Sequence, residues 1–148
     1  MAISYPSFEN KQSLPICQSI SVRWGDMDAF EHVNNIVYLK FFESARIAYF
    51  EKMGIVGDTA SNTGPILAST QCKFIYPLRY PDTIWATAKV VDTQKNDRFT
   101  MEYAVYSQTH QRIAAKGSGV IVSFDYTAQR KVDLPQNWRM AIAEIEKM

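Results

Sequence analysis

Hydrophobic and polar residues alternate along most of this chain, which is the pattern of half-buried β-strands. The first stretch runs from Ile16 to Trp24, and its apolar side chains share one face. Four further strand patterns follow after a loop, near residues 67–76, 83–93, 98–108 and 113–125. Turn-forming residues separate them at 77–82, 95–97 and 110–111. Because short turns join antiparallel neighbours, this pattern predicts a meander of four antiparallel strands.

Residues 35–53 have the period of an α-helix instead. Their apolar side chains cover most of the helix circumference and leave only a narrow polar strip. A helix with so wide an apolar side is expected to be buried on most sides. Asn34 or Asn35 is expected to cap its start, and Gly54 suits a left-handed end.

The order of these elements predicts an α+β fold, with a five-stranded antiparallel sheet wrapped around one long central helix. A short amphipathic segment that begins near Pro135 predicts a short C-terminal helix. The far edge and face of such a sheet would remain open, which favours self-association. Residues 1–15 are polar and carry two prolines, so we expect a loose N-terminal arm on a single domain that spans residues 1–148.

Composition narrows the class of protein. The 148 residues are 47% hydrophobic and 21% charged, which suits one globular core and excludes a disordered chain. No apolar run approaches the roughly 18 residues of a membrane span. The formal net charge of +1 argues against a basic face for nucleic acid. Because the N-terminus lacks a charged stretch followed by an apolar one, we expect no secretory signal and a cytoplasmic location.

Most catalytic and cofactor motifs are absent from the sequence. It contains no phosphate-binding glycine loop, no H-E-x-x-H zinc motif and no G-x-S-x-G elbow. Cys17 and Cys72 lie far apart in strand-like segments without a nearby histidine, so neither is expected to bind a metal. Gly117 and Gly119 lie inside a strand pattern, where we expect glycine to admit a close neighbour.

Residues 23–35 differ from this scaffold, because they place three acids, one histidine and two asparagines between a strand and the long helix. Turns collect such residues, so a polar turn with a helix cap is one interpretation. The other starts from the helix end, whose first N–H groups are unpaired and carry the positive end of the helix dipole. A carboxylate just upstream could attack a carbonyl held there, or activate water against it. That chemistry needs neither a metal nor a serine.

The string D-x-D-x-x-x-H-V-N-N-x-x-Y, from Asp26 to Tyr38, closely resembles the 4-hydroxybenzoyl-CoA thioesterase-like family of hotdog-fold acyl-CoA thioesterases. The resemblance continues at residues 76–83 and 120–125, and covers nearly the whole chain beyond the first dozen residues. It implies the hotdog fold and the hydrolysis of an acyl-CoA to a free carboxylic acid and CoA. CoA is then part of the substrate, and no bound cofactor is implied.

The resemblance also assigns the site residues. Asp28 matches the catalytic carboxylate of the family, which acts as a nucleophile or as a general base for water. Asn35 matches the helix start, where a backbone N–H polarises the thioester carbonyl, and His32 matches a histidine of the catalytic set in many relatives. The chain departs from the pattern twice. Phe30 replaces an asparagine of the plant acyl-carrier-protein thioesterases, and Glu31 replaces a glycine that is common before H-V-N-N.

Other residues are candidates for substrate binding. Asn34 and Tyr38 lie at the helix start, although a helix cap and a core position would explain them equally. Tyr38 is also a candidate for the wall of the acyl pocket. The phosphates of CoA need basic groups at the mouth of the cleft, and the candidates for this role are Arg79, Lys89 and Arg98.

Four residues have mainly structural interpretations. Asp26 is expected to be a turn acid rather than a catalyst. Glu43 and Arg46 are three positions apart on the helix and would form a surface ion pair there. His110 lies in a hairpin turn and is expected to be solvated.

The resemblance implies a homodimer or homotetramer whose active site lies between subunits. Two other functions compete with hydrolysis: a non-catalytic protein that binds acyl-CoA or an acyl-carrier protein, and a hydratase or dehydratase of enoyl thioesters. The presence of Asp28 argues against a pure binder, because an anion beside a bound thioester gains nothing there. A hydratase normally needs a positioned histidine with an acid, and His32 alone supports that poorly.

Overall fold

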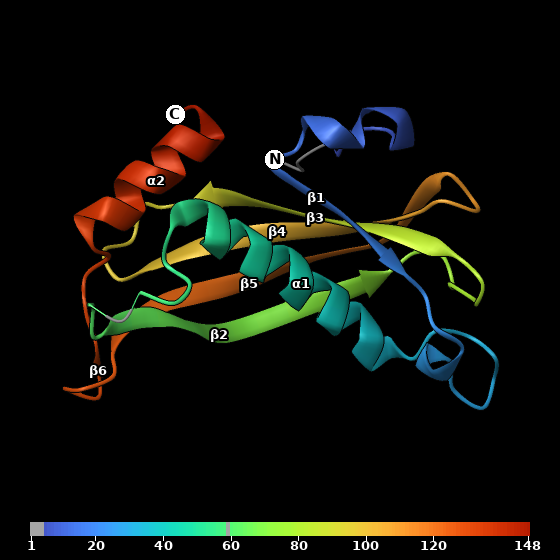
Figure 1. Cartoon of the computed structure of the whole chain (residues 1–148), viewed down its shortest axis with the longest axis horizontal. Helices are drawn as coiled ribbons and strands as arrows, with labels where there is room; N and C mark the ends of the chain where they lie inside the picture. Colours follow the sequence, from blue (N-terminus) through green and yellow to red (C-terminus); the bar gives the residue numbers. More distant parts are fainter. Residues whose placement is uncertain (1–4, 59) are drawn as a thin grey trace.

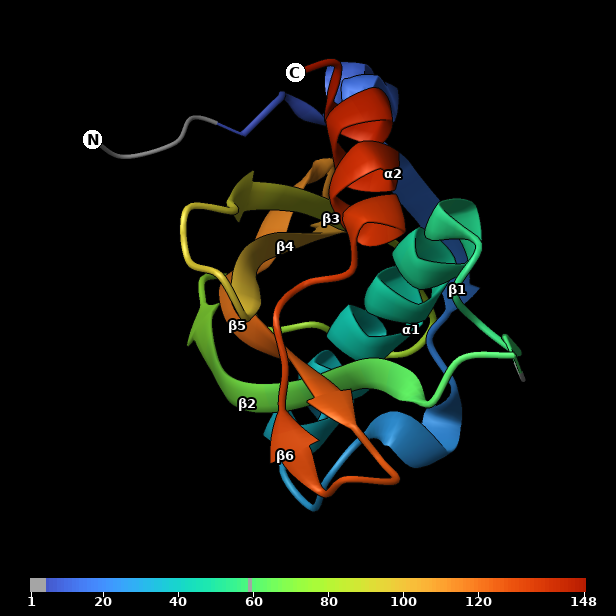
Figure 2. The same ribbon diagram turned by 90° about the vertical axis from the view of Figure 1, so that its left-hand side faces the viewer.

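A long helix lies across a curled antiparallel sheet in the computed structural model of this chain, which describes residues 5–58 and 60–148 (Figure 1). The strands are β1 (Ile16–Ser21), β2 (Thr63–Phe74), β3 (Thr83–Asp92), β4 (Arg98–Ser107) and β5 (Arg112–Asp125), with the two-residue β6 (Arg130–Lys131) beside β5. The helices are α1 (Asn35–Met53) and α2 (Gln136–Glu146). Figure 2 shows the sheet curving around α1. The predicted α+β fold is therefore confirmed.

The strand order differs from a simple meander. In space the order is β1-β3-β4-β5-β2, with every pair antiparallel. The meander prediction is right for β3, β4 and β5 but wrong for β2, which pairs with β5 and not with β3. Residues 75–82 therefore form a crossing connection instead of a hairpin turn. The start of α1 holds this connection, because the Val33 N–H donates to the Leu78 carbonyl at 2.8 Å and the Leu78 N–H donates to the Tyr38 hydroxyl at 3.1 Å.

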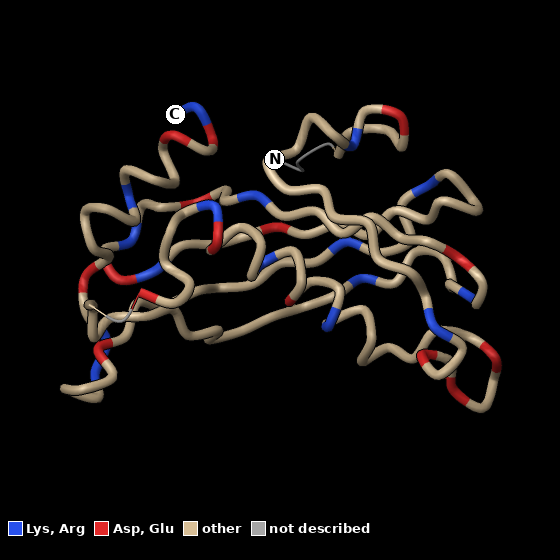
Figure 3. Tube along the Cα trace, in the orientation of Figure 1, with Lys and Arg blue, Asp and Glu red and all other residues tan. Residues whose placement is uncertain are grey.

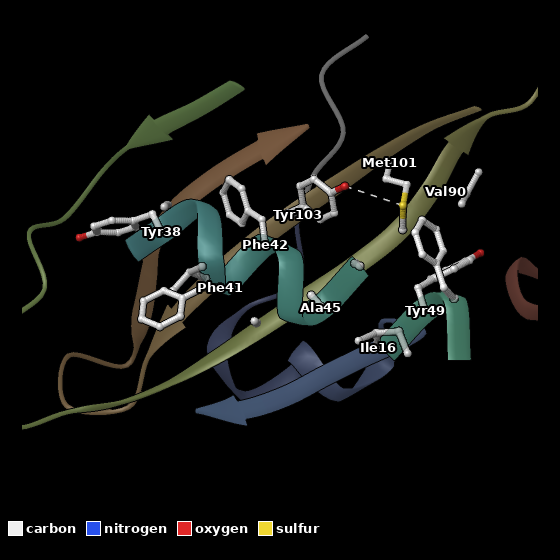
Figure 4. Packing of buried hydrophobic residues seen from close by; sticks show 14 of the residues in the cluster. Ile16, Tyr38, Phe41, Phe42, Ala45, Tyr49, Val90, Met101 and Tyr103 are labelled. Atoms are coloured by element: carbon white, nitrogen blue, oxygen red, sulfur yellow. Dashed lines mark hydrogen bonds between the residues drawn. The ribbon is translucent and has the colours of Figure 1, made fainter. Parts of the chain in front are cut away.

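The apolar side of α1 forms the core (Figure 4). Its buried apolar residues are Tyr38, Phe41, Phe42, Ala45, Tyr49, Phe50 and Met53. Phe42 stacks on Tyr103 of β4 with ring centroids 5.0 Å apart. Gly117 of β5 permits this contact, because a Cβ at that position would lie 2.3 Å from the Phe42 ring. The expected packing role of the strand glycines is therefore confirmed.

The helix α1 is not buried on most sides as predicted, because Ile36 and Leu39 are 65% and 38% exposed. The predicted surface ion pair of Glu43 with Arg46 is also wrong, because Arg46 is buried and donates to the Tyr103 hydroxyl.

Both ends of α1 are closed as predicted. At the start, Asn34 Oδ1 accepts a hydrogen bond from the Ile36 N–H at 3.0 Å, so Asn34 is the cap. At the end, Gly54 has a φ of 80°, the left-handed conformation that glycine adopts without steric cost.

The C-terminal end of α1 is also tied to α2. The buried Tyr49 hydroxyl donates to Glu146 Oε2 at 2.6 Å, and the Val90 N–H donates to the same oxygen at 2.9 Å. One carboxylate oxygen thus joins α1, α2 and β3. None of the helices in the described parts of the chain has the length and apolar character needed to cross a membrane.

The N-terminal segment is packed on the sheet and is not a loose arm over residues 5–15, whereas residues 1–4 lie outside the described residues. The Tyr5 hydroxyl donates to Glu102 Oε2 at 3.0 Å, and the Tyr106 hydroxyl donates to the Pro6 carbonyl at 2.9 Å. Glu102 and Tyr106 alternate with the core residues of β4, so this segment covers the sheet face opposite α1. Lys11 is only 7% exposed. The polar composition of these residues predicts a loose arm, because composition does not show that they pack on an open face of the sheet.

Candidate active site

Residues 24–34 form a compact turn that delivers the chain to the start of α1. A single 3-10 turn at Trp24–Asp26 begins it, and Asp26 Oδ2 accepts a hydrogen bond from the Arg23 N–H at 2.8 Å. The Asp26 carbonyl accepts the Asn34 N–H at 2.9 Å. Asp26 is thus used in holding the turn against the helix start, which agrees with its interpretation as a turn acid.

A second set of bonds closes the loop between Asp28 and His32. The Asp28 N–H donates to the His32 carbonyl at 2.9 Å, and the Glu31 N–H donates to the Asp28 carbonyl at 3.0 Å. This tight closure requires Glu31 to adopt a φ of 63°. Glycine is the least costly residue in that conformation, which gives a physical reason for the glycine common in the resembling family.

The Asp28 carboxylate is fixed by one oxygen only. Oδ1 accepts a hydrogen bond from the Phe30 N–H at 2.8 Å. Within residues 5–58 and 60–148, the other oxygen, Oδ2, accepts no hydrogen bond. The side chain is therefore oriented and keeps one oxygen available for chemistry.

Asp28 lines an open pocket of about 350 Å³ at the start of α1, here called the helix-tip pocket. The walls come from the turn, from the first helical residues and from the chain that leaves β2: Asp28, Phe30, His32, Val33, Asn35, Tyr38, Phe74, Ile75, Tyr76 and Pro77. Four predicted site residues thus meet in one pocket. They are Asp28, His32, Asn35 and Tyr38.

Asn35 lines this pocket and carries a backbone N–H at the start of α1. The neighbouring N–H groups of Asn34, Ile36 and Val37 are all bonded, to Asp26 O, Asn34 Oδ1 and Asn34 O. Among the described residues, the Asn35 N–H donates no hydrogen bond. It sits at the positive end of a 19-residue helix, where an unpaired N–H binds a developing negative charge well.

Tyr38 fixes the opposite wall of the helix-tip pocket. Its side chain is 2% exposed, and its hydroxyl donates to the Tyr76 carbonyl at 3.4 Å while accepting the Leu78 N–H. Its ring meets the Phe74 ring edge-on, with centroids 5.0 Å apart. Burial raises the pKa of Tyr38, so the hydroxyl stays protonated and can keep both bonds. Tyr38 is therefore both a core residue and a pocket wall.

His32 and Asn34 are both predicted site residues, but they differ in what their side chains contact. His32 is exposed on the pocket wall, and no hydrogen bond joins its imidazole to Asp28 or to any other described side chain. Asn34 uses its side-chain oxygen to cap α1 and is not among the pocket-lining residues. His32 is thus positioned for contact with a ligand, whereas Asn34 has a structural task.

Of the three basic candidates, only Arg79 lies at this end of the molecule. It faces Glu31 of the closing turn, with Nη2 3.7 Å from Oε2, and both side chains are exposed. Lys89 lies on the sheet face that the N-terminal segment covers. Arg98 begins β4 beside the C-terminal end of α1, where it pairs with Asp97 at 2.8 Å. Figure 3 shows how widely such charged residues are dispersed along the chain.

Sequence reasoning missed an arginine and a histidine that pack on the pocket residue Tyr76. The ring of Tyr76, a pocket residue, lies 4.5 Å from the His110 ring, and the Arg112 guanidinium lies 4.7 Å from the Tyr76 ring centroid. His110 is exposed, as the sequence predicts, and one side of its ring also packs on the Tyr76 ring. The contact follows from the pairing of β2 with β5, which places residues far apart in the sequence side by side. No local motif signals it.

Within the described residues, no group of three or more His, Cys, Asp or Glu side chains is arranged to hold a metal ion. The residues that line the helix-tip pocket include one carboxylate, Asp28, and one imidazole, His32.

Comparison with known proteins gives a family and a fold. The family model described as thioesterase-like superfamily matches residues 22–142. Acyl-acyl carrier protein thioesterase ATL3 of Arabidopsis thaliana is 28% identical over 122 residues, which are 81% of this chain and 63% of ATL3. The chain spans about half to two thirds of the length of the curated relatives it matches, 49% and 63%.

Solved structures agree with the architecture. The PA5185 protein of Pseudomonas aeruginosa strain PAO1 is 30% identical, with a TM-score of 0.78 over 90% of this chain and 93% of that chain. A thioesterase of Thermus thermophilus, solved in complex with coenzyme A and Zn, is 27% identical, with a TM-score of 0.80 over 91% and 97%. The predicted hotdog fold is confirmed, whereas membership of the narrower 4-hydroxybenzoyl-CoA thioesterase-like family stays a prediction.

Proposed function

This chain belongs to the thioesterase-like superfamily, and from that premise we propose that it hydrolyses the thioester of an acyl-CoA to a free carboxylic acid and CoA. One observation carries the proposal. Asp28, with one oxygen that accepts no hydrogen bond, and Asn35, whose N–H donates none, line the same helix-tip pocket among the described residues. A thioester carbonyl needs such a pair, one group to attack or activate water and one to hold the oxygen.

The reaction begins with the carbonyl oxygen of the substrate accepting the Asn35 N–H. As negative charge develops on that oxygen, the helix dipole and this fixed donor stabilise it. Asp28 Oδ2 then has two routes. It attacks the carbonyl carbon, expelling the CoA thiolate and leaving an acyl-aspartate that water hydrolyses, or it takes a proton from a water that attacks directly. Both routes yield the same acid and CoA.

His32 is the second ionisable group on the pocket wall. An imidazole can donate a proton to a leaving group. In this reaction it supplies the proton that the departing thiolate takes up. His32 makes no hydrogen bond to Asp28, and we therefore assign it this role as an imidazole without a paired acid.

Acyl-CoA is the proposed substrate class because the pocket rim offers cations for phosphates. Arg79 and Arg112 are both exposed and lie at the turn and at the Tyr76 side of the helix-tip pocket. The CoA in the Thermus thermophilus structure supports this class, whereas ATL3 is named for an acyl-carrier protein. Both carriers present a phosphopantetheine arm, but CoA also carries the phosphates of its nucleotide, for which two separate cations are suited.

A second copy of the chain is proposed to complete the site. The helix-tip pocket is open in one chain, and Phe30 on its wall is 82% exposed. Strand β2 beside it is an edge strand with one side unpaired, and α1 exposes Ile36, Leu39 and Ile47. A homodimer or homotetramer that covers these groups would place the active site at a subunit interface.

The test is to follow free thiol, free acid and enoyl absorbance on a panel of aliphatic and aromatic acyl-CoAs and one enoyl-CoA. Hydrolysis predicts free thiol in the amount of acid formed, at a rate that depends on the acyl group. Loss of the enoyl absorbance without thiol release would instead indicate a hydratase. Tight acyl-CoA binding without any turnover would indicate a binding protein. Either result would overturn the proposal.

A further inference from the structure

Asp82 lies at the end of the connection between β2 and β3, and its side chain accepts three hydrogen bonds. Oδ1 accepts the N–H groups of Thr83 at 2.7 Å and Thr109 at 3.0 Å, and Oδ2 accepts the Ser107 hydroxyl at 2.5 Å. Ser107 is fully buried, and its hydroxyl oxygen accepts the His110 N–H at 3.1 Å. This one carboxylate therefore fixes the turn between β4 and β5.

The turn between β4 and β5 carries a side chain that packs on the wall of the helix-tip pocket. The His110 ring lies 4.5 Å from the ring of Tyr76, which is one of the wall residues. The Tyr76 backbone is held separately, because its N–H donates to the Ala114 carbonyl at 3.0 Å and its carbonyl accepts the Tyr38 hydroxyl at 3.4 Å. With the backbone fixed, the position of the Tyr76 ring depends on its side-chain neighbours, and His110 is one of them.

The main chain of Asp82 is tied to the other side of the same pocket. Its carbonyl accepts the Val22 N–H at 2.9 Å, directly after β1 and just before the turn that carries Asp28. Asp82 thus bonds to both segments that flank the pocket, the chain leading to Asp28 and the turn that packs on Tyr76. A residue in this place can set the distance between the two.

We propose that Asp82 and Ser107 are positioning residues of the active site, which act through His110 to hold the Tyr76 wall in place for the substrate. The inference rests on the proposed function for the identity of that substrate. Neither residue is among the described residues that line the helix-tip pocket, so both act at a distance from the reacting atoms.

This role predicts an effect on substrate binding and not on the chemical step. Asp28 is oriented by the Phe30 N–H within its own turn, and that bond does not involve the wall with Tyr76. A wall that contacts the substrate equally in the ground state and in the transition state contributes to binding alone. Loss of its position therefore raises KM and leaves kcat nearly unchanged.

The first experiment measures KM and kcat for acyl-CoA hydrolysis in variants of the full chain. Ser107→Ala removes the link between Asp82 and the His110 N–H, and KM should rise about tenfold while kcat stays within about twofold. Asp82→Asn replaces the acceptor of the Ser107 hydroxyl with an NH₂ group, so KM should rise there too. The double variant should be no worse than the stronger single variant, because both break the same link.

His110 supplies a pair of variants that separates the wall from general stability. His110 is exposed, so its substitution should leave the fold intact. His110→Ala removes the ring from Tyr76 and should raise KM about tenfold, whereas His110→Phe keeps an aromatic ring there and should restore the wild-type KM. A merely structural role of the turn would give both variants the same KM.

Ser123→Ala is the matched control for Ser107→Ala. Ser123 is also fully buried, and its hydroxyl donates to the Val132 carbonyl near the other end of β5 from the turn. This variant should lose a similar amount of stability in urea and keep the wild-type KM. An equal rise of KM in Ser123→Ala and Ser107→Ala would overturn the proposal, since loss of stability would then explain both.

The second experiment is calorimetric titration of S-hexyl-CoA, a thioether that cannot be hydrolysed, into the same chains. Its Kd should rise about tenfold in Ser107→Ala and His110→Ala and stay at the wild-type value in His110→Phe and Ser123→Ala. If these shifts occur but no chain releases thiol from an acyl-CoA, the proposed function fails and the positioning role stands. If thiol is released but KM and Kd are unchanged in Asp82→Asn, Ser107→Ala and His110→Ala, the positioning role fails and the function stands.

Two further outcomes are decisive. If Ser107→Ala does not fold, Asp82→Asn and the two His110 variants give the same test. Absence of S-hexyl-CoA binding to the wild-type chain would overturn both proposals.

Discussion

The two ends of α1 are built in opposite ways. At the C-terminal end the chain satisfies its polar groups, with Gly54 in the left-handed position and Tyr49 bonded to Glu146. At the N-terminal end it leaves the Asn35 N–H and one Asp28 oxygen unbonded, and holds Glu31 at a φ of 63°. The satisfied end contributes stability, whereas the unsatisfied end offers binding groups. Changes at the two ends should therefore affect different measurements.

The largest effect is expected for Asp28→Asn. The amide keeps an oxygen for the Phe30 N–H but is neither a nucleophile nor a base, so kcat should fall at least about a thousandfold. Thiol release under saturating acyl-CoA measures this, and urea unfolding should show an unchanged midpoint. Glu51→Gln, on the exposed side of the same helix, is the matched control and should keep full activity. Full turnover in Asp28→Asn would contradict the assignment of Asp28.

Tyr49→Phe should have the opposite effect, with lower stability and nearly unchanged activity. It removes the donor to Glu146 and leaves that carboxylate with the Val90 N–H alone, so the free energy of unfolding should fall by about 1.5–3 kcal/mol. Urea unfolding measures the loss, and kcat should stay within about twofold of wild type. A large loss of kcat without a loss of stability would contradict the division between the two ends.

Alkaline pH should weaken the C-terminal end through the same tyrosine. Burial, followed by the bond to Glu146 and repulsion from its charge, raises the pKa of Tyr49 above the usual value of about 10. Above pH 10, the tyrosine of the unfolded chain releases a proton that the tyrosine of the folded chain keeps. The contribution of Tyr49 to stability is therefore complete below about pH 10 and decreases as pH rises above it. Urea unfolding at pH 9, 10 and 11 should show a shallower decline in Tyr49→Phe than in wild type. Equal slopes would refute this.

The smallest effect is expected for Glu31→Gly. Glycine adopts the positive φ without steric cost, and the exposed pair with Arg79 at 3.7 Å contributes little. Because glycine also has more freedom in the unfolded chain, the net gain in stability should be only about 0.5 kcal/mol. Thermal unfolding would measure it, with Glu51→Gly as a control that should lose stability in the helix. A loss of stability in Glu31→Gly would show that the glutamate contacts outweigh the strain.

Local periodicity made the core of this molecule predictable. The helix at 35–53, its Asn34 cap and its Gly54 end follow from neighbours in the sequence, and the structure has them at the same residues. It was also predictable that Asp28 and Asn35 line the same pocket, because only a few residues separate them in the sequence. Their shared location follows from one turn and one helix start.

Long-range pairing was not predictable in the same way. The sequence indicates that β2 is a strand but not that it pairs with β5, and that pairing brings Arg112 to Tyr76. The inward turn of Arg46 depends on a hydroxyl from Tyr103, far along the chain. Periodicity places a residue on a face of its own element, and only the tertiary register determines what it meets there.

The central claim is that the free N–H of Asn35 holds the carbonyl oxygen of the substrate, and Asn35→Pro tests it most directly. Proline lacks this N–H but is favoured at the first position of a helix, and Asn34 already has the extended conformation, φ −59° and ψ 139°, that precedes proline. The account predicts that kcat falls about 100- to 1,000-fold at unchanged stability, while Asn35→Ala, which keeps the N–H, remains active. Wild-type turnover in a folded Asn35→Pro protein would contradict it.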